Sequence, residues 1–195
     1  EVFQKGSTLF GIDLAAKAIG RTGTAIVCEG YTDVIALHSA GFENAVATLG
    51  TATSEHHLRR LFKIVPEVIF CFDGDQAGRT AAARAMETVL PVLDDGLQAR
   101  FLFLPDGEDP DTLIRREGKE AFEQRLNKAD HLPEFLFEHL KSQVDFDTLN
   151  GKARLDQLAA PLINRLPRGT TLRNLMEKTL QDQIGTESAA LKKLE

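Results

Sequence analysis

Apolar residues in the first half of the chain fall into short runs, most of which end at an acidic residue. The clearest run, VIFCF at 68–72, stops at Asp73. A run that is apolar at every position is typical of a strand buried on both faces of a sheet. TAIVC at 24–28 follows the same pattern, NAVAT at 44–48 is a shorter candidate, and residues 98–104 are a fourth candidate strand. The chain therefore predicts about four strands of a mostly parallel sheet.

Helical patterns separate these strands. Residues 31–40 and 76–93 follow strands through glycine-containing turns, and Thr53 or Ser54 is placed to cap a helix that ends near residue 64. Strands that alternate with helices predict an α/β fold with helices flanking the sheet. A first, short helix is expected at 13–19, ended by turn glycines at 20 and 23.

From residue 118 onward the pattern changes to helices only. Apolar residues between 155 and 166 recur at the spacing of one helical face, with Pro161 as a predicted bend, and another helix follows near 172–180. We interpret this part as a small all-helical subdomain. The predicted organisation is an end piece of a preceding subdomain at 1–23, an α/β domain at 24–117 and the helical subdomain at 118–195.

Acidic side chains follow three of the four candidate strands. In chain order they are Glu29, Asp73, Asp75, and then Asp106, Glu108, Asp109 and Asp111. Because the carboxyl ends of parallel strands meet at one edge of a sheet, where ligands bind in open α/β folds, these acids are expected to gather there. Carboxylates held close together repel one another unless a cation lies between them, and hard oxygen ligands suit Mg²⁺ or Mn²⁺. Three strands ending in carboxylates favour a metal site over coincidence.

Each acid also has a structural interpretation. Asp73-Gly74-Asp75 could be a solvated turn with a helix cap, and Asp109 before Pro110 is a common way to start a helix. Asp33, in the first turn of the helix after Glu29, could be a metal ligand or could simply favour the helix dipole, a contribution of about 0.3–1 kcal/mol. The residues alone leave both roles of Asp33 open.

Composition narrows the function classes. The 195 residues carry 29 acidic and 23 basic side chains, a net charge of −6. Most free-standing nucleic-acid binders are basic, so this balance disfavours tight DNA binding by the chain alone, although bound metals would cancel several negative charges. No apolar run approaches the ~20 residues needed to span a membrane, and no leader is visible. The start at Glu1, without Met, suggests a piece of a longer protein.

The cysteines and histidines do not have the spacing of zinc ligands. Cys28 and Cys71 lie inside predicted strands, where buried, reduced thiols are expected, in agreement with a cytoplasmic location. No CxxC or HxxxH spacing is present, so no zinc is expected in this chain. His56 and His57 are adjacent and are interpreted as surface residues.

Several motifs together resemble a known family. CEGYTD at 28–33, FDGDQAG at 72–78 and LPDGEDPD at 104–111 are similar to the TOPRIM domain of primases, topoisomerases and some nucleases. EVFQKG at 1–6, LGTA at 49–52 and PDGEDPDTL at 105–113 resemble, more closely, the bacterial replicative DNA primases. The resemblance covers essentially the whole chain. It implies a TOPRIM-type, Rossmann-like sheet within the primase's RNA polymerase domain.

The resemblance assigns roles to individual residues. Glu29, Asp73 and Asp75 match the catalytic acids that hold divalent metals, with Glu29 as either ligand or proton acceptor. Asp33, Asp109 and Asp111 match further acids of the same metal cluster, and Lys5 matches a lysine near the incoming nucleotide. The implied cofactor is two or more Mg²⁺ or Mn²⁺ ions. Such ions would neutralise the triphosphate, activate the attacking 3′-hydroxyl and stabilise the pyrophosphate leaving group.

The family also implies partners. The substrates would be ribonucleoside triphosphates, a single-stranded DNA template and the growing RNA primer, at the bacterial replication fork and away from membranes. A zinc-binding domain, a basic template-binding half and a helicase-binding domain are expected to lie outside this chain. The replicative helicase would then be contacted through a domain absent here.

Other functions remain as alternatives. A topoisomerase would need a nucleophilic tyrosine, and the sole tyrosine, Tyr31, is expected in the core of the site. A Mg²⁺-dependent nuclease or phosphohydrolase would use the same acids, but the primase-like helical part disfavours it. A non-catalytic module could bind nucleotides or regulatory molecules through the same metals.

Overall fold

The structure is a computed structural model that describes residues 9–48 and 52–185. Lys5, which the resemblance assigns to nucleotide binding, lies outside the described residues. Within the described ranges, none of the helices combines the length and the apolar character needed to cross a bilayer.

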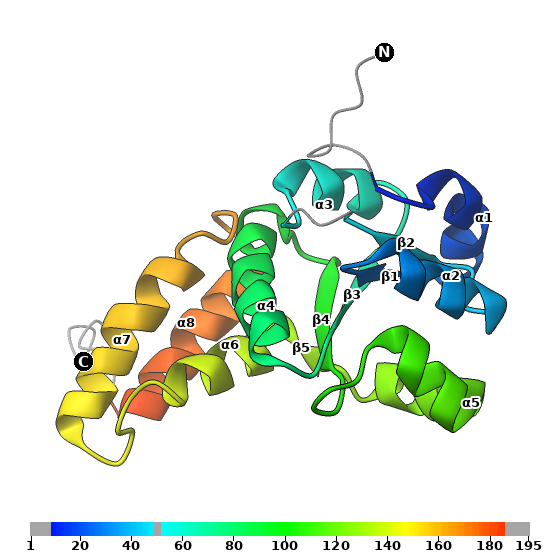
Figure 1. Cartoon of the computed structure of the whole chain (residues 1–195). Coiled ribbons are helices and arrows are strands. Elements are labelled where there is room, and N and C mark those ends of the chain that lie inside the picture. Colours follow the sequence, from blue (N-terminus) through cyan, green and yellow to red (C-terminus); the bar gives the residue numbers. More distant parts are fainter. Residues whose placement is uncertain (1–8, 49–51, 186–195) are drawn as a thin grey trace.

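Strands and helices alternate as far as residue 127 (Figure 1). The strands are β1 (Thr24–Cys28), β2 (Ala45–Ala47), β3 (Glu67–Phe72), β4 (Gln98–Phe103) and β5 (Asp130–His131). The helices are α1 (Ile12–Thr22), α2 (Tyr31–Ser39), α3 (Glu55–Phe62), α4 (Gln76–Val89), the short 3₁₀ helix η1 (Leu90–Val92), α5 (Pro110–Asn127), α6 (Leu132–Lys141), α7 (Leu149–Ile163) and α8 (Thr171–Ile184).

The five strands form one sheet in the order β2-β1-β3-β4-β5. The first four are parallel, and β5 pairs with β4 in the antiparallel direction. The strand order reverses its direction between β1 and β3, which makes their carboxyl ends the topological switch point where α/β folds bind ligands. This arrangement confirms the predicted α/β fold and places Glu29 and Asp73 at the switch point.

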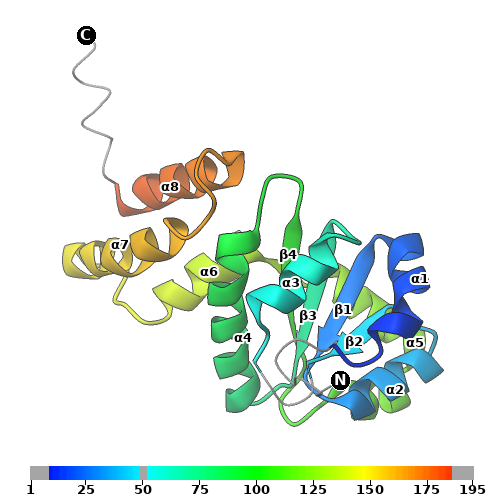
Figure 2. The ribbon, with the colours of Figure 1, turned by 90° about the horizontal axis from the view of Figure 1, so that it is seen from above.

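Helices cover both faces of the sheet, and each face has its own hydrophobic cluster. On one face, α2 and α5 enclose a cluster that includes Ile26, Ile69 and Phe122. On the other, residues of α1, α3, α4 and α6 pack around Val68, Phe70 and Phe101. Figure 2, seen from above, shows α3 and α4 across one face of the sheet with α2 and α5 behind it. Strand residues that alternate between the two clusters explain the continuous apolar runs.

The C-terminal helices α6, α7 and α8 continue the second cluster rather than forming a separate core. Phe135 of α6 stacks on Phe101 of β4 with ring centroids 4.6 Å apart, and the same cluster extends to Leu180 of α8. At the amino edge of the sheet, the carboxylate of Asp95 accepts hydrogen bonds from the amides of Thr171 (2.7 Å) and Leu172 (3.1 Å) at the start of α8. The helical part is therefore tied to the sheet through both apolar and polar contacts.

Two local predictions are wrong. The chain after residue 118 is not purely helical, because Asp130 and His131 form β5; two exposed polar residues give no apolar run that a sequence could reveal. His57 is fully buried rather than on the surface, whereas His56 is exposed. His57 occupies the third position of α3, where its amide donates to Ser54 Oγ (3.3 Å) and its Nδ1 accepts from the Ser54 amide (3.4 Å).

The local caps otherwise follow the sequence closely. Ser54 is the N-cap of α3, as predicted. The first helix is longer than predicted because α1 continues through Gly20 and ends only at Gly23, which has a positive φ of 73°. Cys28 and Cys71 are buried and free, in the strands where they were predicted.

Candidate metal centre at the carboxyl edge of the sheet

The β1–α2 junction holds the most unusual carboxylate. Glu29 directly follows β1, and its Oε1 atom is buried without a hydrogen-bond partner among the described residues. Asp33 lies four residues further on, only 7% exposed, and its Oδ2 accepts a hydrogen bond from the Gly30 amide (3.2 Å). A buried, unpartnered carboxylate oxygen is costly unless a ligand satisfies it.

The β3–α4 junction explains the glycines of FDGDQAG. A Cβ atom on Gly74 would lie 1.9 Å from the carbonyl oxygen of Pro105, and a Cβ on Gly78 would lie 2.2 Å from that of Asp73. Gly74 does not have a positive φ. Gly74 is thus required by the close approach of the loops after β3 and β4, and this approach brings the acids of the two loops together.

Asp75 has a structural role as well as a candidate catalytic one. It is the N-cap of α4, and its Oδ1 accepts a hydrogen bond from the Gly78 amide (2.7 Å). Asp73 directly follows β3 and has no such cap. One oxygen of Asp75 therefore has the helix-capping role that the sequence offered as a structural interpretation. The other oxygen remains available to a ligand.

The acids after β4 have local partners. Asp109 caps α5 by accepting hydrogen bonds from the amide (2.7 Å) and hydroxyl (2.8 Å) of Thr112. Asp111 forms an ion pair with Arg115 (2.7 Å), and Glu108 pairs with Arg116. The carbonyl of Glu108 also accepts from the Gly74 amide (3.2 Å), which joins this loop to the β3–α4 junction. Asp109 and Asp111 thus lie beside the candidate centre but are partly neutralised or committed to capping.

The electrostatics show that the acids act on one another. Burial, and then the charges of Asp73 and Asp75, raise the pKa of Glu29. Burial also raises the pKa of Asp73, with Asp109 and Asp75 adding to the effect.

Asp33 has the largest pKa shift of these carboxylates. Burial and the charge of Asp73 raise the pKa of Asp33 to about 6, against a smaller lowering by the Gly30 hydrogen bond. A cation placed among these carboxylates would relieve the repulsion and favour their charged forms.

The donor set fits a hard divalent cation. Within the described ranges, no three carboxylate, histidine or cysteine side chains converge on a single ion position. Mg²⁺ usually keeps several waters and binds through one or two carboxylates plus substrate phosphates, so it does not need a closed cage of protein ligands. The buried, unpartnered Oε1 of Glu29 and the mutually raised pKa values are the features that such an ion would satisfy.

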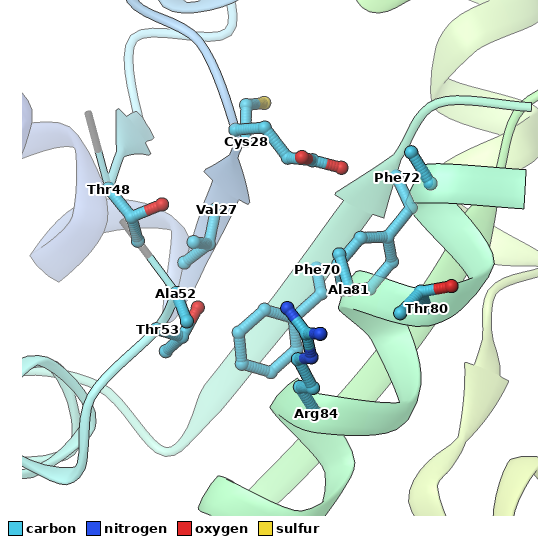
Figure 3. A pocket seen from close by; sticks show the side chains of 12 residues that line it. Val27, Cys28, Thr48, Ala52, Thr53, Phe70, Phe72, Thr80, Ala81 and Arg84 are labelled. Atoms are coloured by element: carbon cyan, nitrogen blue, oxygen red, sulfur yellow. The ribbon is translucent and has the colours of Figure 1, made fainter. Parts of the chain in front are cut away.

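A cavity of about 370 Å³ opens beside Glu29, on the face of the sheet covered by α3 and α4. Figure 3 shows its floor of Val27, Phe70 and Phe72, with Thr53 on one wall and Thr80 and Arg84 of α4 on the other. The guanidinium of Arg84 has no ion pair or hydrogen bond with any other described residue, although the Arg84 carbonyl accepts from the Thr88 hydroxyl (2.8 Å). Sequence reasoning missed this cavity, because its walls come from four separate segments.

Tyr31 does not lie in the core of the site. It is 55% exposed in the first turn of α2, where its ring meets Phe10 edge-on at 6.0 Å. That expectation is wrong because Tyr31 is the first residue of α2 and points away from the buried stripe, which includes Asp33, Val34 and Leu37.

Comparison with known proteins agrees with this geometry. Residues 23–103 match the family model of the Toprim domain, and residues 133–189 match that of the DnaB-helicase binding domain of primase. The DNA primase of Pseudomonas putida is 53% identical over 194 residues, which is 99% of this chain and 29% of that protein. The chain belongs to the bacterial DNA primase family.

Solved primase structures superpose over most of the chain. A DNA primase domain from Pseudomonas aeruginosa has a TM-score of 0.91 at 53% identity, covering 95% of this chain and 58% of that one. A DnaG primase catalytic domain bound to ssDNA has a TM-score of 0.86 at 50% identity, covering 92% and 58%. The chain spans less than a third of the P. putida primase. Membership of the Toprim and primase families implies divalent-metal binding.

The second family match corrects one expectation. A helicase-binding domain was expected to lie wholly outside this chain, but residues 133–189 match the primase helicase-binding model. The error arose because the apolar stripe of these helices was interpreted only as core. The boundaries at 23, 117 and 118 stay predictions.

Proposed function

We propose that this chain is the metal-bearing part of a DNA primase's catalytic domain, which joins ribonucleoside triphosphates into short RNA primers on single-stranded DNA. The observation that carries the proposal is the buried, unpartnered Oε1 of Glu29 at the switch point of the sheet, beside Asp73 and Asp75. The primase relatives, of which the chain spans about a third or less, support the reaction type.

In this proposal, Glu29, Asp73 and Asp75 hold two or more Mg²⁺ ions, and Asp33, Asp109 and Asp111 add negative charge around them. When bound, the ions would neutralise the triphosphate, lower the pKa of the attacking hydroxyl and stabilise the leaving pyrophosphate. The chain's own contribution is to hold the carboxylates in position. Gly78 holds one oxygen of Asp75 by its amide and leaves the other for a ligand.

Asp33 holds a proton more readily than an ordinary aspartate. With its pKa raised to about 6, its carboxyl group is partly protonated in the metal-free protein near pH 6 and mostly charged at pH 7. Binding of a divalent cation beside it would lower that pKa and release the proton. Proton release on metal binding is therefore part of the proposal and can be measured directly.

The partners are proposed on the same basis. Residues 133–189 would contact the replicative helicase, since they match the helicase-binding model, and a related catalytic domain is described as bound to ssDNA. The net charge of −6 agrees with a template-binding surface that lies mainly on another part of the protein. The site of action would be the replication fork in the bacterial cytoplasm.

Two other functions are less well supported. A topoisomerase would need the exposed Tyr31 at the metal centre, whereas its ring packs against Phe10. A metal-dependent nuclease would not need residues that match a helicase-binding model. A non-catalytic nucleotide-binding module would bind nucleotide but fail to incorporate it even when the rest of the catalytic domain is supplied.

Calorimetric titration of Mn²⁺, with and without a ribonucleoside triphosphate, tests the proposal. We expect binding that is strengthened by the nucleotide, accompanied by proton uptake by the buffer, and lost in an Asp73→Asn/Asp75→Asn double variant. Lys5→Ala should weaken triphosphate binding and spare binding of the bare metal. Equal loss of both would remove Lys5 from the nucleotide site, and absence of Mn²⁺ binding by the unaltered chain would contradict the metal centre.

A further inference from the structure

A second cavity, of about 570 Å³, lies on the other side of α4 from the one beside Glu29. α4 and α6, which contact each other, form its walls, and the last residue of β4, Phe103, lines it. Gln76, directly after Asp75, is part of its rim. Since Gln76 begins α4 and Phe103 ends β4, the cavity opens at the same edge of the sheet as the acids.

One wall of this cavity is aromatic. Phe103 is half-buried, its ring lies 5.3 Å from that of Phe135, and the Phe135 ring lies 5.7 Å from that of His139. All three side chains line the cavity. Exposed aromatic faces are where proteins stack the bases of single-stranded nucleic acid, with little dependence on sequence.

The charges around the cavity suit a nucleotide unit better than a free phosphate. Arg79 of α4 is exposed, and its guanidinium has no ion pair or hydrogen bond with any other described residue, whereas its backbone amide donates to the Asp75 carbonyl. Glu138 is paired with Lys141 (3.2 Å), which leaves Asp130 as the acid of the lining that has no ion pair among the described residues. A carboxylate accepts from the amino groups of bases and repels phosphate, so the base belongs inside and the phosphate beside Arg79.

We propose that this cavity binds one unpaired base of the single-stranded nucleic acid that the metal centre acts on. The inference rests on the proposed function and deepens it, because it gives the strand a second point of attachment on this chain. The base stacks against Phe103, the neighbouring phosphate pairs with Arg79, and the amide of Gln76 is placed to contact the base or sugar. DNA template and RNA primer offer the same chemistry to the cavity.

Photocrosslinking tests this placement. Short DNA and RNA single strands, each carrying one 5-iodouracil, are irradiated with the chain at low salt, and the adducts are mapped by mass spectrometry. We expect adducts on Phe103, Phe135 or His139 in at least one of the two arms, and the stronger arm identifies the strand. Adducts confined to other surfaces, or none in either arm, would overturn the proposal.

Fluorescence anisotropy measures how variants of the chain bind the same strands. Phe103→Leu keeps apolar volume but removes the aromatic face, and about a 5-fold or greater loss of affinity is expected. Arg79→Ala should reduce the salt dependence of binding by about 0.7 in the log–log slope, the value for one phosphate contact on a single strand. Arg168→Ala, which removes an exposed arginine between α7 and α8, is the charge-matched control and should leave the slope unchanged.

The outcomes separate this inference from the proposed function. If Mn²⁺ and triphosphate bind as expected but Arg79→Ala and Arg168→Ala change strand binding equally, the cavity inference fails and the metal centre stands. If Phe103→Leu lowers the melting temperature, the exposed Gln76→Ala replaces it, and unchanged crosslinking and affinity in both Gln76→Ala and Arg79→Ala would overturn the inference. Binding of a protein partner in this cavity, in place of either nucleic-acid strand, would also overturn the inference.

Discussion

The carboxylates at the two edges of the sheet differ in how their charge is held. At the carboxyl edge, burial and neighbouring acids raise the pKa of Glu29, and one of its oxygens has no partner among the described residues. At the amino edge, the amides of Thr171 and Leu172 hold the pKa of Asp95 below its usual value. The same chemical group is thus satisfied at one edge and unsatisfied at the other.

The difference distinguishes a structural acid, Asp95, from a candidate ligand-binding acid, Glu29. Asp95 joins the turn before β4 to the start of α8, so its charge stabilises the native fold. Glu29 and its neighbours repel one another, so their charges lower the stability of the metal-free protein. Functional sites commonly keep such unfavourable arrangements because a ligand satisfies them. Substitutions at the two edges should therefore have opposite effects on stability and binding.

The largest expected effect comes from a pair of glycines, one at each edge. Gly74→Ala places a methyl group against the carbonyl oxygens of Pro105 and Leu104, and should cost about 3 kcal/mol of unfolding free energy. Gly96→Ala has open space but a φ of +88°, and should cost only about 1 kcal/mol. Urea unfolding of both variants measures the difference. Equal losses would mean that the two loops do not need their close approach.

Asp75 allows capping and metal binding to be separated. Asn caps a helix about as well as Asp, so Asp75→Asn should keep the fold's stability while Mn²⁺ affinity falls by about 10-fold or more. Asp75→Ala removes the cap as well and should cost about 1 kcal/mol in addition. Calorimetry with Mn²⁺ and urea unfolding give the two readouts. A metal-free Asp75→Asn protein that is clearly less stable would make the role of Asp75 structural.

The pH dependence of the metal-free protein should carry the signature of Asp33. Its folded pKa of about 6 exceeds the unfolded value of 3.8, so the folded state binds more protons between these values. The contribution of Asp33 to stability must then fall as the pH rises from about 4 to 6, by on the order of 1 kcal/mol. Thermal melting across this range is the measurement. Asp33→Asn should remove this contribution, and profiles of the same shape in the wild type and in Asp33→Asn would contradict the raised pKa.

Asp95 should show the opposite sign with a smaller effect. Because its folded pKa is lowered, its contribution to stability is present above pH 4 and is lost as the pH falls through the folded pKa. Asp95→Asn should lower the melting temperature at pH 7 and remove this acid-dependent loss, while leaving Mn²⁺ binding unchanged. A loss of Mn²⁺ affinity in Asp95→Asn would break the contrast between the two edges.

The sequence was most informative where burial and chemistry change abruptly. The runs TAIVC and VIFCF predicted β1 and β3, because strands covered on both faces must be apolar at every position. Glu29 and Asp73 could be placed at one edge for the same reason, since parallel strands bring their carboxyl ends together. The assignment of individual acids as ligands stays a prediction.

Features that depend on distant segments could not be predicted in this way. β5 exists only because Asp130 and His131 reach β4, and the buried His57 lies on α3, which packs against β3, α4 and η1. The requirement for glycine at 74 comes from the backbone of residues 104 and 105 rather than from the local turn. Arg79 and Arg84 are both exposed arginines of α4, and only the fold shows that they line two different cavities.

The shared hydrophobic cluster of β4 and α6–α8 has a consequence for cooperativity. Helices with a core of their own could melt while the sheet remained folded, and the heat-capacity curve would then have two peaks. Here the Phe101 ring stacks on Phe135, and the cluster runs without interruption from Ile12 to Leu180. Detaching the helices would uncover the sheet's own apolar face, so the two parts should unfold together in a single calorimetric transition.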